Sequence, residues 1–261
     1  MTETEALRRL QEVLSRTPRL AIAVSGGVDS MTLAHIAHRS VDALMVHALS
    51  PAVPPEATAR VRAHGKTYGW QLVTTATGEF DDERYLTNPV NRCYFCKVNL
   101  YDRIAQLTDR PIASGANLDD LGDYRPGLVA AGERGAFHPL VEAGIGKAEI
   151  RALAGRLGLD DLSELPAQPC LASRVETGIA IDAEDLIFVD AVEKKARHLA
   201  PALVNIRCRI LKQGVLLELD DPAAPGAPEA ARAAREMALD SGRKWAGAAR
   251  YRRGSAFVGA T

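Results

Sequence analysis

Short apolar runs alternate with amphipathic stretches through the N-terminal part of the chain. Four of the runs have the length and the bounding turn residues of buried strands: 20–24, 43–48, 71–75 and 111–114. Between them, 31–38 has the spacing of a helix and the Pro54-Pro55 pair marks the start of another. This alternation predicts an α/β fold, a parallel sheet sandwiched by helices with ligand sites at the carboxyl ends of its strands.

The pattern changes after residue 175. The sequence there predicts a helix over 182–199, a second helix after residue 228, and three strands over 204–211, 214–219 and 247–252. A Pro/Ala/Gly-rich linker spans 222–228, and no glycine-rich loop occurs in this part. We therefore predict two domains, over 1–174 and 175–261, the second of which is a small α+β domain.

Composition narrows the class of partner. The 261 residues are 47% hydrophobic and carry a formal net charge of −1, so no basic excess draws the chain to nucleic acid or anionic membranes. The acidic N-terminus differs from a signal peptide, and no apolar run approaches the roughly 20 residues of a membrane span. We expect a cytoplasmic protein without membrane or nucleic-acid partners, whose four cysteines are thiols or metal ligands.

The most informative motif is a Ser-Gly-Gly-Val-Asp-Ser loop between the first strand and the next helix. Gly26 and Gly27 let the backbone approach an anion, whose charge the amides and dipole of the helix stabilise. Ser25 and Ser30 add hydroxyl donors, and Asp29 is suited to cap the helix or orient a metal ion. The loop predicts a phosphate site, and a glycine turn without a ligand is the alternative.

Two further segments carry candidate chemistry. Cys93 and Cys96 form a C-x2-C pair, which is half of a metal or cluster site, and Cys170 is the candidate that completes it. Coincidental cysteines or a redox dithiol are alternatives for the pair, and Cys170 beside Arg174 could instead be a nucleophile towards an adenylated carbonyl.

A polar segment also follows the fourth predicted strand, and it contains Gly115, Asn117, Asp119, Asp120, Asp123 and Arg125. Gly115 and Asn117 could close over a base or ribose. The carboxylates could hold Mg²⁺ against phosphates, and Arg125 could bind a phosphate or carboxylate. A solvated acidic loop is the other interpretation.

Five segments in order carry a family resemblance. They read Ser-Gly-Gly-Val-Asp-Ser, Asn-Pro-x-x-Arg-Cys-Tyr-Phe-Cys-Lys, Gly-x-Asn-x-Asp-Asp-x-Gly-Asp-Tyr-Arg-Pro-Gly, Pro-Leu-x-Glu-Ala-Gly-x-x-Lys-x-Glu-Ile-Arg and Cys-Leu-Ala-Ser-Arg. Together they resemble the LarE family of ATP-dependent sulfur transferases, in the PP-loop ATP pyrophosphatase superfamily. The resemblance implies an adenine nucleotide alpha hydrolase-like PP-loop domain over 1–174, and substrate binding and oligomerisation by the domain over 175–261.

The resemblance also implies a reaction. With ATP and Mg²⁺ the enzyme adenylates a carboxylate of a pyridinium dicarboxylate mononucleotide, releases pyrophosphate and exchanges AMP for sulfur, which serves nickel-pincer cofactor biosynthesis. Members with only the later cysteine sacrifice its sulfur and form dehydroalanine, whereas members that also have the pair resemble enzymes that pass on a sulfide bound to a 4Fe-4S cluster. We expect the cluster, held by Cys93, Cys96 and Cys170 and supplied by sulfide or another sulfur donor; sacrifice of Cys170 is the alternative.

Roles for single residues follow from the same resemblance. Asp29 and Cys170 are expected to be catalytic, and the first loop to hold ATP. Cofactor or substrate binding is expected of five basic residues: Lys97, Arg125, Arg174, Arg207 and Arg209. Arg207 and Arg209 lie two apart on one strand face and match an Arg-x-Arg that would bind the substrate phosphate; two solvated arginines are the alternative. Glu193 is a weaker candidate for a polar contact within the site.

Departures from the family pattern leave other functions open. Ala52-Val53-Pro54-Pro55-Glu56 replaces a charged helix start, and Gln168-Pro169 before Cys170 is unusual, so a different small carboxylate could be the acceptor. A tRNA-thiolating PP-loop enzyme would also use three cysteines, although the near-neutral charge disfavours it. A non-catalytic nucleotide-binding or iron-sulfur protein is the third possibility. The family also implies a homo-oligomer, and Cys208 is predicted to be a packed core thiol.

Overall fold

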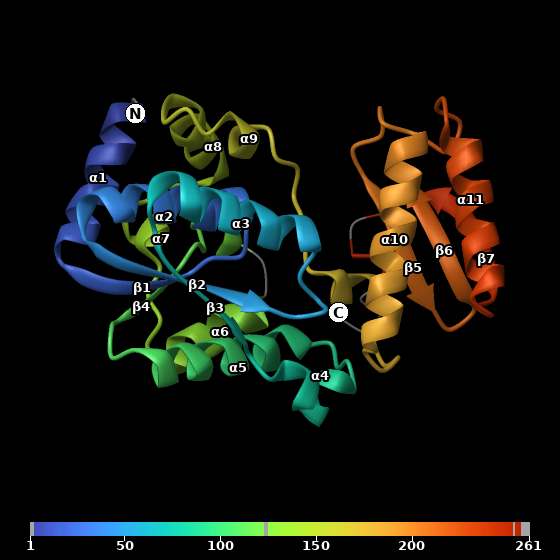
Figure 1. Cartoon of the computed structure of the whole chain (residues 1–261), viewed down its shortest axis with the longest axis horizontal. Coiled ribbons are helices and arrows are strands. Elements are labelled where there is room, and N and C mark those ends of the chain that lie inside the picture. The colour runs from blue at the N-terminus through green and yellow to red at the C-terminus, as the bar shows by residue number, and fades with distance from the viewer. Residues whose placement is uncertain (1–2, 123–124, 253, 257–261) are drawn as a thin grey trace. The chain divides into compact units, whose positions relative to one another are not determined.

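The computed structural model describes residues 3–122, 125–252 and 254–256, and the chain forms two compact units. The first comprises Met1–Asp82 and Asn91–Gln168, and the second comprises Glu83–Val90 and Pro169–Thr261 (Figure 1). Of the helices in the described ranges, none is both long and apolar enough to cross a membrane.

A four-stranded parallel sheet forms the centre of the first unit. Its strands, in the spatial order β3-β2-β1-β4, are β1 (Arg19–Ala23), β2 (Asp42–Leu49), β3 (Gln71–Ala76) and β4 (Ile112–Ser114). β1 pairs with both β2 and β4, so Ala21 lies opposite Leu44 on one side and Ile112 on the other. Each of the four predicted strands is present, with its ends displaced by no more than one residue. The expected α/β sheet is confirmed.

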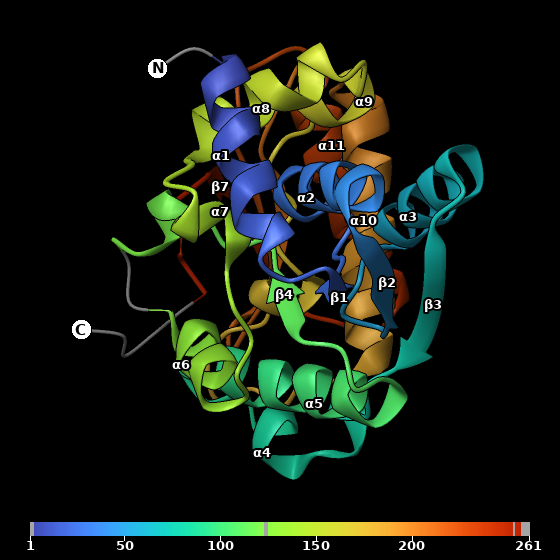
Figure 2. The same ribbon diagram turned by 90° about the vertical axis from the view of Figure 1, so that its left-hand side faces the viewer.

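Helices cover both faces of this sheet (Figure 2). The helices and short 3-10 turns of the first unit are α1 (Glu3–Ser15), α2 (Val28–Ser40), α3 (Pro55–Tyr68), η1 (Glu79–Asp81), α5 (Arg92–Leu107), η2 (Leu118–Asp120), α6 (Pro126–Glu133), α7 (Pro139–Glu142), α8 (Lys147–Arg156) and α9 (Asp160–Ser163). Leu20 and Ile22 of β1 pack with α1, α2 and α8, whereas Ala21 and Ala23 pack with α5 and α6. Successive side chains of a strand point to opposite faces, so a strand covered on both sides must be apolar throughout.

The second unit is a three-stranded sheet with two long helices. Its strands, in spatial order, are β5 (Ile206–Leu211), β6 (Gly214–Leu219) and β7 (Trp245–Arg250). β5 and β6 are antiparallel, and β7 runs parallel to β6. The remaining elements are α4 (Glu83–Leu86), η3 (Leu171–Arg174), α10 (Ala183–Leu199) and α11 (Ala227–Asp240). Asp182 caps α10 by accepting hydrogen bonds from the amides of Glu184 and Asp185.

Strand ends in the second unit differ slightly from prediction. The strand expected over 204–211 begins at Ile206, because the carboxylate of Asp220 accepts hydrogen bonds from the amides of Val204 and Asn205 at 3.0 and 2.6 Å. β6 has the predicted bounds, and the last strand lies slightly earlier than the expected 247–252.

The division of the chain also differs from the predicted boundary after residue 174. The segment that includes α4 belongs to the second unit, since the buried Asn88 side chain donates to the carbonyl oxygens of Glu176 (2.9 Å) and Ile179 (2.8 Å). Asn88 has a φ of 53°, a conformation that asparagine tolerates better than most residues. Cys170 and Arg174 likewise lie in the second unit, because Arg174 pairs with α10.

His35 on α2 is a buried histidine. It is 1% exposed and meets Tyr68 edge-on with ring centroids 4.5 Å apart, and neither ring nitrogen has a hydrogen-bond partner among the described residues. Burial, with smaller contributions from Arg39 and His64, lowers the pKa of His35 from 6.5 to about 4. The folded chain therefore holds this ring neutral.

We expect His35 to make the protein less stable in acid. In the unfolded chain the ring takes up a proton below a pKa of 6.5, whereas in the folded chain it does so only near about pH 4. As the pH falls from 6.5 to about 4, the free energy of unfolding therefore decreases by up to about 3 kcal/mol. Chemical unfolding of His35→Phe from about pH 7 to pH 4.5 should show a smaller loss than wild type. His198→Gln, at an exposed histidine, should keep the wild-type slope. Equal losses in His35→Phe and wild type would contradict this assignment.

Candidate functional site

The Ser-Gly-Gly-Val-Asp-Ser loop joins the carboxyl end of β1 to the start of α2. Gly26 has a φ of 84°, and a Cβ there would lie 2.8 Å from the carbonyl oxygen of Ala57, so only glycine fits. The amide of Ser25 donates to the hydroxyl oxygen of Ser30 (3.1 Å), and the two hydroxyl oxygens lie 3.0 Å apart. Gly27 is the N-cap of α2. The loop thus presents hydroxyl groups and a helix start, which is the arrangement of an anion site.

The carboxyl end of β4 packs against this loop. A Cβ on Gly115 would lie 2.7 Å from the amide nitrogen of Ser30. Two residues later, the buried Asn117 donates through Nδ2 to Oδ2 of Asp29 at 3.1 Å. Oδ1 of Asp29 is buried and has no hydrogen-bond partner among the described residues. Burial and then the charge of Asp120 raise the pKa of Asp29.

The acidic segment is tied into the fold. Oδ1 of Asp120 lies 3.0 Å from Nη1 of Arg125 and 3.3 Å from Nζ of Lys147. Its Oδ2 accepts from the amide of Asn117, while Asp119 accepts from the amide of Lys147 at 2.6 Å. The two carboxylates therefore have structural partners, unlike those of a solvated loop, and the magnesium ligation expected of them stays a prediction. Asp123 and Tyr124 of this motif lie outside the described residues.

Three further side chains near this edge were missed at the sequence level. Ser114, the last residue of β4, lies 2.8 Å through Oγ from Nδ1 of His138. Burial lowers the pKa of His138. Arg60 of α3 donates to the carbonyl oxygen of Gly26 at 2.6 Å. Lys147 belongs to one of the family motifs, and the only sequence feature that could have indicated His138 is the His-Pro pair at the start of α7.

Cys93 and Cys96 lie in the first turns of α5. Residues three apart share one face of a helix, so the two partly buried cysteines lie on the same face of α5. Lys97 follows on the same helix, and its side chain packs under α6, where a Cβ on Gly127 would lie 3.1 Å from Cγ of Lys97. The C-x2-C pair is thus at a helix start, with a lysine close by.

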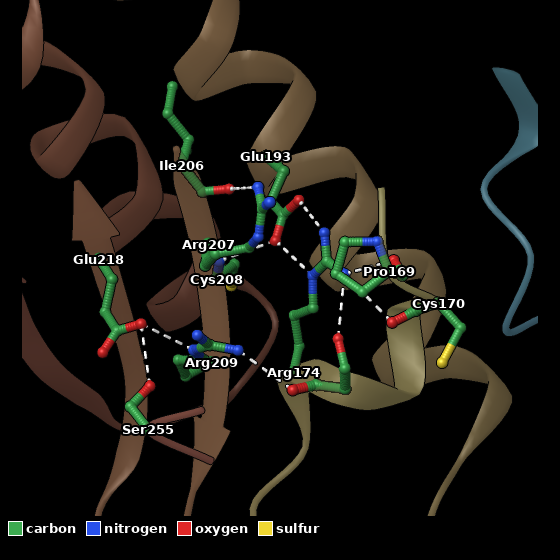
Figure 3. A network of polar contacts seen from close by, with 11 residues as sticks. Pro169, Cys170, Arg174, Glu193, Ile206, Arg207, Cys208, Arg209, Glu218 and Ser255 are labelled. Atoms are coloured by element: carbon green, nitrogen blue, oxygen red, sulfur yellow. Dashed lines mark hydrogen bonds and ion pairs between the residues drawn. The ribbon is translucent and has the colours of Figure 1, made fainter. Parts of the chain in front are cut away.

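In the second unit, Cys170 lies beside a buried network of charges (Figure 3). Cys170 is exposed, whereas Arg174 and Glu193 are buried and form a two-bond ion pair with both distances at 2.9 Å. Arg209 pairs with the buried Glu218 at 2.8 Å and donates to the carbonyl oxygen of Ser173 at 3.1 Å.

Arg207 and Arg209 are 6% and 4% exposed, so the alternative of two solvated arginines is wrong. Arg207 donates to the carbonyl oxygen of Ile206 at 2.8 Å. Its pKa is lowered by burial and then by the nearby charge of Arg174. Cys208 between them is fully buried, as predicted, and burial raises the pKa of its thiol.

The candidate residues therefore fall into two groups. The loop residues, Asp29 among them, come together with Gly115 and Asn117 at one sheet edge. In the second unit, Arg174 of η3 comes together with Glu193 of α10 and the two arginines of β5. Over the described ranges, no three His, Cys, Asp or Glu side chains form a group that could hold a metal ion. Cys93 and Cys96 belong to the first unit and Cys170 to the second, so their joint ligation of a cluster stays a prediction.

Comparison with known proteins gives three relatives, and no family model matches the chain. An uncharacterized protein of Synechocystis sp. is 38% identical over 207 residues, which is 77% of this chain and 77% of that protein. An uncharacterized protein of Methanocaldococcus jannaschii is 26% identical over 79% of each chain. The pyridinium-3,5-bisthiocarboxylic acid mononucleotide synthase of Lactiplantibacillus plantarum is 28% identical over 76% of this chain and 74% of its own.

The close approach of Gly115 to Ser30 predicts the effect of one methyl group. In Gly115→Ala the new Cβ would meet Ser30 backbone atoms at 2.7 Å, which cannot rotate away, so we expect a loss of about 1–3 kcal/mol in the free energy of unfolding. Gly132→Ala is the control, because an added Cβ in this helical position meets nothing within 4 Å and should be neutral or stabilising. If chemical unfolding gives the two variants similar stability, the backbone of Ser30 does not approach Gly115 closely enough to exclude a methyl group.

Proposed function

The chain belongs to the LarE-like family, and on that premise we propose that it is a sulfur transferase of nickel-pincer cofactor biosynthesis. The substrate is a pyridinium dicarboxylate mononucleotide, one carboxylate of which becomes a thiocarboxylate. The observation that carries the proposal is the loop after β1, where Ser25, Gly26 and Ser30 frame the start of α2 as an anion site. Similarity to a pyridinium-3,5-bisthiocarboxylic acid mononucleotide synthase supports the choice of substrate.

In this proposal the first unit performs the ATP half of the reaction. The amides at the start of α2 and the hydroxyls of Ser25 and Ser30 bind the phosphates of ATP. Asp29, whose Oδ1 is buried and has no hydrogen-bond partner among the described residues, would hold Mg²⁺, which would supply charge to neutralise the phosphates. A carboxylate oxygen of the substrate forms a bond to the α-phosphorus, the bond from that phosphorus to the bridging oxygen breaks, and pyrophosphate leaves with the electron pair. The product is an acyl adenylate.

Two basic residues of the first unit suit the anions of this step. Arg125 precedes α6 and pairs with the carboxylate of Asp120. We propose that its guanidinium binds a phosphate or substrate carboxylate in the same way. Lys97 is partly buried on α5 and contributes a point charge. We assign both to ATP or to the substrate carboxylates.

The second unit is proposed to hold the substrate phosphate. Its buried network contains three guanidinium groups, of Arg174, Arg207 and Arg209, and two carboxylates, of Glu193 and Glu218. Three guanidinium groups that lie close enough to influence one another supply the charge-assisted donors that a phosphate binds. This supports the role that the family resemblance gives to Arg207 and Arg209.

The sulfur is proposed to come from a 4Fe-4S cluster held by Cys93, Cys96 and Cys170. The donor set fits, because three thiolates suit iron and sulfide, two of them share a helix face and the third is exposed. When bound, the cluster supplies the sulfide that replaces AMP on the acyl carbon. If Cys170 is sacrificed instead, its thiolate attacks the acyl adenylate and AMP leaves. A base then removes the Cα proton of Cys170, the Cα=Cβ double bond forms, and the Cβ–S bond breaks to give the thiocarboxylate and dehydroalanine. A cytoplasmic location and a homo-oligomeric state stay predictions.

Asp29 provides a test of the ATP chemistry. Asp29→Asn keeps the size of the side chain but removes the charge proposed to bind Mg²⁺, so ATP- and substrate-dependent pyrophosphate release should fall about 100-fold. Asp109→Asn, at an exposed carboxylate of the same unit, is the control and should retain wild-type release. Release of pyrophosphate at an equal rate by Asp29→Asn would refute the role of Asp29, and its absence from wild type would refute the function.

The sulfur source can be tested by iron analysis. Anaerobically purified wild type should contain about four irons and four acid-labile sulfides per chain, and Cys93→Ala and Cys170→Ala should lose them. Cys208→Ala is the matched control, since this buried thiol is not among the proposed ligands and iron should be retained. The opposite outcome is wild type without iron, in which mass spectrometry after turnover with ATP and substrate finds Cys170 converted to dehydroalanine. That outcome would establish the sacrificial route.

A further inference from the structure

The guanidinium of Arg174 has partners on two sides (Figure 3). Nε and Nη2 donate to Oε1 and Oε2 of Glu193, each at 2.9 Å. Nη1 donates instead to the carbonyl oxygens of Pro169 (2.6 Å) and Cys170 (3.1 Å) and to Oγ of Ser173 (3.1 Å). One side of the group is thus held by α10, and the other side holds the turn that carries Cys170.

Glu193 is itself fixed by the core of the second unit. It lies in the middle of α10, and its side chain is 5% exposed. Oε1 accepts a third hydrogen bond from the amide of Cys208 in β5, at 3.0 Å. Because a helix and a strand both hold this carboxylate, its position is set by the packed core.

Cys170 is the exposed member of an otherwise packed turn. Leu171, Ala172 and Val175 are buried, whereas Cys170 is exposed. In Figure 3 the contacts drawn to Cys170 reach its carbonyl oxygen, and its sulfur points away from Glu193. The network therefore orients the backbone of Cys170 and leaves the thiol accessible.

We infer that Glu193 is a positioning residue for Cys170 and acts through Arg174. A guanidinium is planar, so the carboxylate bound to Nε and Nη2 decides where Nη1 points. Without Glu193 the group would be free to turn, its charge would lack this buried partner, and the carbonyl oxygens of Pro169 and Cys170 would lose their common donor. The functional consequence rests on the proposed sulfur transfer, whereas the effect on the turn follows from the geometry alone.

Amide hydrogen exchange tests the effect on the turn. In Glu193→Gln, exchange over 171–175 should be about tenfold faster or more, since hydrogen bonds such as that from the Ser173 amide to the Cys170 carbonyl depend on this anchor. Glu193→Asp keeps the charge and should restore part of the protection. The matched control is Asp185→Asn, which removes another carboxylate–arginine pair of α10, to Arg243 at 2.7 Å, and should leave exchange over 171–175 unchanged.

A comparison of the two half-reactions separates positioning from general damage. In Glu193→Gln, the amount of thiocarboxylate formed per pyrophosphate released should fall about 100-fold, whatever happens to the rate of pyrophosphate release itself. A loss caused only by an unstable fold would lower both rates together and leave this ratio unchanged. If wild type releases no pyrophosphate, the proposed function fails, while the exchange result still decides whether Glu193 holds the turn.

Arg174→Lys keeps the inference testable if Glu193→Gln does not fold. Lysine retains a charge for Glu193 but lacks the planar fork that reaches Pro169 and Cys170 at the same time. Exchange over 171–175 should again be faster than in wild type. Wild-type exchange in this variant, or equal exchange in Glu193→Gln and Asp185→Asn, would overturn the inference.

Discussion

Parallel hydrogen bonding of β1 to both β2 and β4 is the constraint on which the first unit depends. Parallel strands end at the same edge, so the loop after β1 and the segment after β4 must meet there. Gly115 allows that meeting because a side chain would collide with Ser30. The strands, in turn, can be central only because both faces are apolar and covered. Burial of the sheet thus produces the edge where chemistry is proposed.

Charge pairing has the corresponding role in the second unit. Buried arginines need buried carboxylates as ion-pair partners, and Glu193 and Glu218 pair with Arg174 and Arg209. These pairs connect η3, α10, β5 and β6, so the turn at Cys170 is joined to the core by ionic groups. The guanidinium groups gathered there are also charge-assisted donors, and these are the groups proposed to bind an anion.

The two units show different relations between sequence and site. The loop of Ser25 to Ser30 is one short segment, and its glycines and serines predict an anion site without reference to the tertiary structure. The arginine cluster is assembled from residues distant in sequence, and Glu193 was only a weak candidate because a glutamate in a helix is ordinarily solvated. Similarly, Asp119 and Asp120 read as free carboxylates until their contacts with Lys147 and Arg125 are seen.

By itself the sequence determined the order of the strands, the glycine turn after β1 and the burial of Cys208, because periodicity and glycine turns are local properties. Only the tertiary structure decided that residues 83–90 and 169–174 belong with the second unit, and that Arg207 and Arg209 are buried. Those outcomes depend on hydrogen bonds between residues far apart in the chain, as between Asn88 and Glu176 or Arg174 and Glu193. No pattern within a short window records such pairings, since each partner alone is compatible with a solvated position.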